Sequence, residues 1–272
     1  MFTRFLLSSI AVAALTASLP AQAQQVKVTI TNLAPAQGVL FTPVWVGFHN
    51  GLFDPFDAGE TAITPIERLA EDGNTAPISD MFSARGYTHQ ATLPGTGGAI
   101  ANPPLFEPGE TISMVFDLNG ADANNRYLSF LSMILPSNDA FIGNDNAKSL
   151  KVFNDDGSFA GADFTISGAH VWDAGTEVND EIPAHVPVLG QAAPNTGVSE
   201  IGGPVRQHAG FIPGGNILTA FPGGDFTQAG YQIAHVQVTA VPEPETYAML
   251  LAGLGLVGLV ARRRKPKMLH IS

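Results

Sequence analysis

Residues 25–32 have the sequence Gln-Val-Lys-Val-Thr-Ile-Thr-Asn, in which every second residue is apolar and β-branched. Successive side chains of an extended chain point to opposite faces, so Val26, Val28 and Ile30 share one face. This alternation predicts a half-buried β-strand.

Similar short runs recur along the chain, separated by segments rich in the 29 glycines and 20 prolines of the sequence. We expect further strands at residues 41–48, 111–116, 127–135, 149–153 and 231–238. Asn154-Asp155-Asp156-Gly157 is a turn signal, and residues 184–226 show no periodicity and are expected to form long loops. Together these features favour an all-β fold, an antiparallel β-sandwich.

One helix is predicted within this domain. Thr64 is a suitable N-cap, Pro65 suits the first helical position, and Glu67 completes the spacing of a capping box. We expect the helix to run from Pro65 to Ala70 and to end near Gly73.

The N-terminus has the organisation of a secretory signal. Arg4 precedes an apolar run from Phe5 to Leu15, and Ala21-Gln22-Ala23 supplies the small residues that signal peptidase requires. The sequence therefore predicts a signal peptide at residues 1–23, removed before Gln24. The alternative is a buried N-terminal helix.

The C-terminus has an uncharged apolar segment at about residues 247–261, followed by Arg262-Arg263-Arg264-Lys265. The segment is short for a membrane span, which takes roughly 20 residues. A basic cluster holds its end of a transmembrane helix in the cytoplasm, which leaves the domain outside. The sequence predicts a marginal C-terminal transmembrane helix.

The order of the parts at residues 242–267 is more specific than their hydropathy. Pro242-Glu243-Pro244, the apolar segment and the arginine-rich end resemble the PEP-CTERM sorting signal of Gram-negative bacteria. The resemblance implies export, transient anchoring in the inner membrane, and cutting near Pro-Glu-Pro by the transpeptidase exosortase. The expected final location is the cell surface or the extracellular space, often with extracellular polysaccharide or biofilm. A plain tail anchor is the alternative.

The domain between the two ends, residues 24–241, is strongly acidic. It contains seven basic and 22 acidic residues, a net charge of −15. Such a surface argues against binding nucleic acid, whose phosphates need a basic face, and suits cations or solubility outside the cell. The sequence has no cysteine, which excludes disulfides, thiolate metal sites and cysteine nucleophiles.

Four segments of this domain together resemble the spondin N-terminal domain, a family of extracellular matrix adhesion proteins with a C2-like β-sandwich. They are Thr42–His49, Leu69–Asn74, Leu131–Gly143 and Val171–Glu177. The resemblance spans about residues 25–240 with gaps. Its hallmark Ser-Pro-Asp-Trp loop corresponds to Ser137-Asn138-Asp139-Ala140, and its Asp-Ala-Gly-Thr-Asp loop to Asp173-Ala174-Gly175-Thr176-Glu177. Two residues of the first loop and the last of the second depart from the family, and its usual cysteines are missing.

The spondin resemblance implies a calcium ion held by Asp139, Asp173 and Glu177. The chemistry is reasonable because calcium takes six to eight oxygen ligands from carboxylates, carbonyls and water. Alternatively, Asp173 only starts a turn and Glu177 is solvated. Glu71 falls at a family position too, and we interpret it as a solvated acid at a helix end.

No motif of an enzyme accompanies these features. The sequence lacks His-Glu-x-x-His, the Gly-x-Ser-x-Gly elbow and the P-loop. We therefore expect a non-enzymatic surface or matrix protein of the adhesion type, whose partner is an extracellular polysaccharide or a surface protein. The alternatives are a secreted enzyme acting on polysaccharide, because a carboxylate pair has no sequence signature, and a surface component without a specific ligand.

Overall fold

The computed structural model describes residues 24–96, 104–242 and 251–258. The predicted signal peptide and most of the predicted sorting tail lie outside these ranges. Of the expected transmembrane segment, residues 251–258 are helical and exposed. Within the described ranges, no helix is both long enough and apolar enough to cross a membrane.

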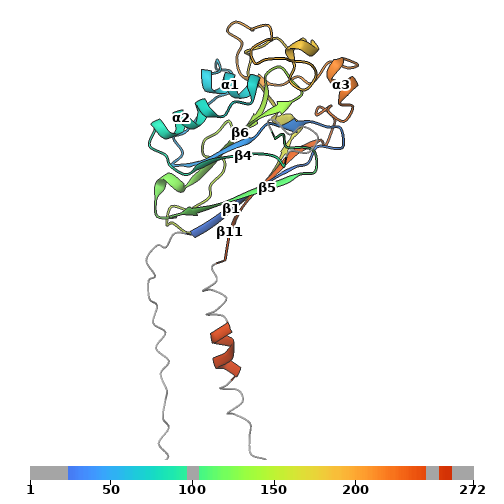
Figure 1. Ribbon diagram of the computed structural model, residues 1–272. Helices are drawn as coiled ribbons and strands as arrows, with labels where there is room; N and C mark the ends of the chain where they lie inside the picture. Colours follow the sequence, from blue (N-terminus) through green and yellow to red (C-terminus); the bar gives the residue numbers. More distant parts are fainter. Residues whose placement is uncertain (1–23, 97–103, 243–250, 259–272) are drawn as a thin grey trace, which may run out of the picture.

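Two antiparallel sheets form the domain, as the sequence predicts (Figure 1). The first sheet has the strand order β5 (Thr111–Leu118), β1 (Gln24–Asn32), β11 (Gln232–Ala240) and β8 (Ala162–Ser167). The second has the order β10 (Arg206–Gln207), β9 (Trp172–Asp173), β7 (Ala140–Gly143), β6 (Tyr127–Leu135), β3 (Val44–His49) and β4 (Gln90–Leu93), and β2 (Leu40–Phe41) also pairs with β6. The arrangement is that of a β-sandwich.

The main core lies between the sheets. In β1 the alternation works as predicted, because Val26, Val28 and Ile30 are buried in the core while Lys27 and Thr29 between them are less buried. In contrast, β6 is buried along nearly its whole length. A second cluster, which includes Trp45, covers the other face of its sheet, so both faces of β6 meet apolar side chains.

That second cluster joins the sheet to two helices, α1 (Thr64–Asp72) and α2 (Ala76–Ala84). The α1 helix occurs where it is predicted and ends as expected, with Gly73 in the left-handed conformation at φ +65°. Its predicted capping box is wrong. Ile63 is the N-cap, no side chain caps the helix, and Glu67 contacts Arg68 instead. The remaining helical elements are α3 (Asn216–Ala220) and the short turns η1 (Ala123–Asn125), η2 (Gly168–His170) and η3 (Pro183–His185).

The predicted strands at 25–32, 111–116, 127–135 and 231–238 are confirmed, whereas 41–48 is divided into β2 and β3. The predicted strand at 149–153 is wrong. Lys151 and Phe153 form only isolated bridges, because the chain turns back immediately at the confirmed turn of residues 154–157.

Both chain connections leave the domain at one end of the sandwich. In the antiparallel pair of β1 and β11, Val26 lies opposite Ala240, next to the two segments that lead to the termini. We call the opposite end, where β1 finishes at Asn32 and β11 begins at Gln232, the distal end.

Candidate functional site

The pairing of two short strands brings the predicted ligands together. Asp139 directly precedes β7, and Ala140 of β7 pairs with Asp173 of β9. Glu177 follows four residues later, in the turn after β9. The C-terminal half of α1 packs on the same side, because α1 contacts both β6 and β7. We call the resulting group of carboxyl side chains the acidic site.

Asp139 is fully buried and organises this turn. Its Oδ2 accepts hydrogen bonds from the backbone N–H of Thr176 at 2.8 Å, the backbone N–H of Glu177 at 3.0 Å and the Thr176 hydroxyl at 3.2 Å. Its other oxygen, Oδ1, has no hydrogen-bond partner among the described residues. Burial, and then the charge of Asp173, raise the pKa of Asp139 to about 6.

Asp173 starts a tight turn, as one sequence interpretation predicted. Its Oδ1 accepts from the Gly175 N–H at 2.7 Å. Gly175 has φ +68°, and a Cβ atom there would lie 2.6 Å from the backbone oxygen of Pro204. Glycine is therefore required both by the backbone conformation and by the close approach of a second loop.

The second oxygen of Asp173 is occupied too. Oδ2 accepts from Asn179 Nδ2 at 2.8 Å and forms a 3.1 Å ion pair with Arg206. Arg206 also holds Glu200 through two hydrogen bonds of 2.9 Å. Sequence reasoning missed Arg206, although it is one of only seven basic residues in the domain.

Glu177 is buried, so the interpretation that it is solvated is wrong. Its Oε2 lacks a hydrogen-bond partner in the described ranges. Burial raises its pKa to about 7, with further contributions from Glu71, Asp139 and Asp72. Gly197 lies directly over the carboxyl group, since a Cβ atom there would meet Oε2 at 2.1 Å.

The acidic residues of α1 complete the site. Glu71 is only 5% exposed, so the expectation of a solvated helix-end acid is wrong. Arg68 binds Glu71 at 2.8 Å and Asp72 at 3.1 Å, and it also contacts Glu67. One guanidinium group thus binds three carboxyl groups, and Glu177 has no ion pair within the described residues.

Seven carboxyl groups and two guanidinium groups make up this connected network. The acids are Glu67, Glu71, Asp72, Asp139, Asp173, Glu177 and Glu200, and the bases are Arg68 and Arg206. Burial raises the pKa of three of these acids, Glu71, Asp139 and Glu177, and the charges of neighbouring carboxyl groups raise each of them further.

The site offers oxygen atoms to a cation but does not already form a metal cage. In the part of the chain that the structure describes, no three Asp, Glu or His side chains are grouped so as to hold a metal ion. Single unpartnered carboxylate oxygens remain on Asp139, Glu177 and Asp72. Such hard oxygen atoms suit calcium or magnesium rather than softer metals.

Comparison with known proteins gives one match, in the tail. The model of the PEP-CTERM protein-sorting motif matches residues 240–265. The match begins where the β-sandwich ends, so it does not test the resemblance of that domain to spondin. No curated protein matches the chain. The motif identifies the chain as an exported protein of the kind that exosortase processes at the membrane of a Gram-negative cell.

Proposed function

We propose that the exported domain is a non-enzymatic adhesion module whose acidic site binds calcium. The observation that carries the proposal is the pair of buried carboxyl groups, Asp139 and Glu177, each with an oxygen atom that has no hydrogen-bond partner among the described residues. A buried carboxylate without a partner is costly, and a divalent cation removes that cost.

Asp173 is the third ligand in this proposal, and it requires a rearrangement, because both of its oxygen atoms already accept hydrogen bonds. Its Oδ2 must leave Arg206, with which it forms the 3.1 Å ion pair. Arg206 keeps a partner throughout, because its two hydrogen bonds to Glu200 do not involve Asp173. Calcium then supplies the positive charge that the guanidinium group gives to Asp173 in its absence.

The resemblance to the spondin family supports the same assignment. That resemblance implies a C2-like sandwich and ligands in the two loops that the structure brings together at Asp139 and at residues 173–177. A calcium ion between these loops would fix the distal surface against which a polysaccharide or a surface protein binds.

A thermal melt tests the calcium site. Binding to the folded state at 100 times Kd stabilises by about 2.7 kcal/mol, which raises the Tm of a domain of this size by roughly 5–10 °C. We expect this rise with calcium over EDTA in the native chain, and its loss in Asp173→Asn and Glu177→Gln. Asp163→Asn is the matched control, because Asp163 is an exposed acid bound to Gln237 and His235 in the first sheet. An absent calcium shift in the native chain would rule the site out.

A second function has one observation in its favour. Two neighbouring carboxyl groups with raised pKa values, about 6 for Asp139 and about 7 for Glu177, suit a general acid in glycoside hydrolysis. An enzyme would release reducing sugar from extracellular polysaccharide, and Glu177→Gln would abolish the release. Calcium binding without any such release supports the adhesion module.

A further inference from the structure

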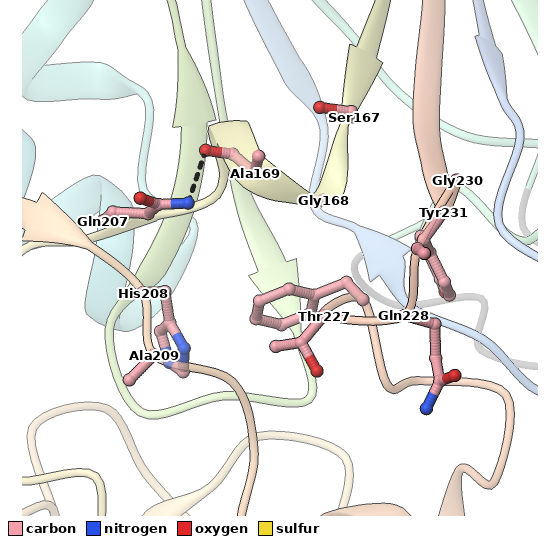
Figure 2. A pocket seen from close by; sticks show the side chains of 12 residues that line it. Ser167, Gly168, Ala169, Gln207, His208, Ala209, Thr227, Gln228, Gly230 and Tyr231 are labelled. Carbon is pink, nitrogen blue, oxygen red and sulfur yellow. Dashed lines mark hydrogen bonds between the residues drawn. The ribbon is translucent and has the colours of Figure 1, made fainter.

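A cavity of about 440 Å³ lies at the distal end, beside the acidic site. Three segments line it: the end of β8 with η2, the residues that follow β10, and the loop that leads into β11. Figure 2 shows Gln207 and His208 on the left, Ser167–Ala169 above, and Gln228 with Tyr231 on the right. This volume is within the range of small-molecule binding sites, roughly 300–1,000 Å³.

The lining is polar but carries no charged side chain. Its polar groups are amides, hydroxyls, an imidazole and backbone atoms, accompanied by the ring of Tyr231, while the Phe226 side chain is buried in the core behind it. This is unusual in a domain with 22 acidic residues. Since arginine and lysine are absent from the lining, the cavity has nothing to neutralise a phosphate, a sulfate or a carboxylate.

Two amide side chains of the lining are exposed, and each donates one hydrogen bond to the protein. Gln207 donates its Nε2 to the backbone oxygen of Ala169 at 3.0 Å (Figure 2). Gln228 donates its Nε2 to Asp225 at 2.6 Å. Each amide has a second N–H and a carbonyl oxygen beyond this bond. These groups can therefore both donate to and accept from a hydroxyl group.

His208 is a neutral side chain in the wall of the cavity, and its Nε2 is enclosed by protein rather than open to the cavity. Its Nδ1 accepts from the Gly210 N–H at 3.0 Å, so the proton of the neutral ring is on Nε2. Burial holds the pKa of His208 down at about 4, which keeps the ring neutral at pH 7. Nε2 has no hydrogen-bond partner among the residues described, although the side chain is almost completely buried. A buried N–H without an acceptor costs about 1–3 kcal/mol.

We propose that this cavity binds a neutral sugar unit of a polysaccharide. A sugar ring offers many hydroxyl groups, each both donor and acceptor, and two weakly polar C–H faces. The amides of Gln207 and Gln228 match the hydroxyl groups, and the partly exposed ring of Tyr231 matches a C–H face. Asp225, which holds Gln228, disfavours acidic sugars.

The location supports the assignment. The cavity lies where β11 begins, at the end of the sandwich away from the sorting tail. A bound polysaccharide would therefore approach the face that points away from the membrane anchor. The inference rests on the proposed adhesion function, but its chemistry does not depend on calcium.

Calorimetric titration of the full chain in detergent, with EDTA present, tests the sugar site separately from the calcium site. The probes are neutral hexose oligosaccharides and matched oligosaccharides containing uronic acid. We expect the neutral probes to bind with Kd on the order of 1 mM or tighter, and the acidic probes to bind at least tenfold more weakly.

Two glutamines provide a matched pair of variants. Gln228→Ala removes a lining amide, and we expect it to weaken neutral-sugar binding about tenfold, the loss of one or two hydrogen bonds. Gln237→Ala removes an amide that is likewise bound to a carboxylate, Asp163, but on the sheet away from the cavity, and should bind as the native chain does. Equal affinity of the two variants, binding of acidic sugars alone, or no sugar binding at 10 mM would each overturn the proposal. The last result would leave the cavity with ordered water only.

Discussion

Arg206 is a single residue that neutralises part of the negative charge of the acidic site. It is the one base bound to Asp173 in the described network, and it also serves Glu200. A guanidinium group and a divalent cation compete for the same carboxylate, because each supplies positive charge to it. The calcium affinity of the site is thus expected to depend on a residue that is not a ligand.

Replacing this base tests that competition. Arg206→Gln should lower the stability measured in EDTA by about 1–2 kcal/mol, since Asp173 loses an ion pair. The same variant should bind calcium about tenfold more tightly, because the guanidinium group no longer has to be displaced from Asp173. Arg126→Gln is the control, as Arg126 faces only an exposed acid, Asp155, at 3.7 Å. Equal calcium affinities of all three chains, measured by titration, would contradict the competition.

A buried imidazole gives the protein a predictable response to acid. His49 is fully buried, its Nδ1 accepts from Gly51 N–H at 3.0 Å, and its Nε2 lies 2.9 Å from the Ser129 hydroxyl. Burial lowers its pKa from 6.5 to about 4. The folded state therefore binds the proton less well than the unfolded chain does. The stability that the neutral ring contributes is complete above pH 6.5 and is lost as the pH falls towards 4.

His49→Gln isolates this contribution. The variant should be less stable than the native chain at pH 7.5, and the difference should shrink by about 3 kcal/mol between pH 7 and pH 4. Urea unfolding across that range measures it. A difference that stays constant with pH would show that His49 does not titrate as its burial requires. Burial lowers the pKa of His208 in both chains, so its effect on the pH dependence of stability cancels when the two chains are compared.

Local sequence pattern is sufficient to predict some strands and helices but not others. β1 was predictable because one of its faces is solvated, so polarity alternates. β7 and β9 have four and two residues, too short for a periodic pattern, yet their pairing builds the acidic site. The capping box failed because the helix starts one residue earlier than predicted: Ile63 is the N-cap, so Thr64 is already the first helical residue and Glu67 is not at the required spacing.

The candidate ligands were predictable only through family resemblance, and their surroundings were not predictable at all. Asp139 and Glu177 carry no signal that separates them from the other 20 acids of the domain. The contacts of Asp139 with residues 176–177, and the ion pair of Asp173 with Arg206, join segments 30 or more residues apart. Such contacts follow from tertiary packing, which no local pattern encodes.

The turn after β9 is the element whose conformation matters most for this site. Gly175→Ala should destabilise the protein by about 2–4 kcal/mol for two reasons. The added Cβ clashes with the backbone oxygen of Pro204, and alanine is strained in the left-handed conformation of this residue. Gly202→Ala is the matched control. Its φ is +72° but no atom lies within 4 Å of the added Cβ, so only about 1 kcal/mol is expected. Urea unfolding of both variants measures the difference, and equal losses would show that the turn does not depend on the contact with Pro204.

In the whole molecule, the two chain connections and the candidate sites lie at opposite ends of the sandwich. The chain enters and leaves at one end, where β11 leads into the sorting motif. The acidic site and the cavity both lie at the distal end. The distance between them and the tail means that processing of the tail need not alter either site.

Processing itself is a prediction about the whole chain. Exosortase cutting near Pro-Glu-Pro should give a product that ends close to Pro244, which the intact mass of the exported protein measures. Replacing residues 242–244 by alanine should leave the longer chain in the membrane fraction, whereas Thr246→Ala, just outside the Pro-Glu-Pro sequence, should be processed normally. Calcium-dependent Tm shifts should be equal in the processed and the retained forms, because the tail joins the domain at the end opposite the acidic site. A retained form that has lost its calcium shift would show that the two ends of the sandwich are coupled.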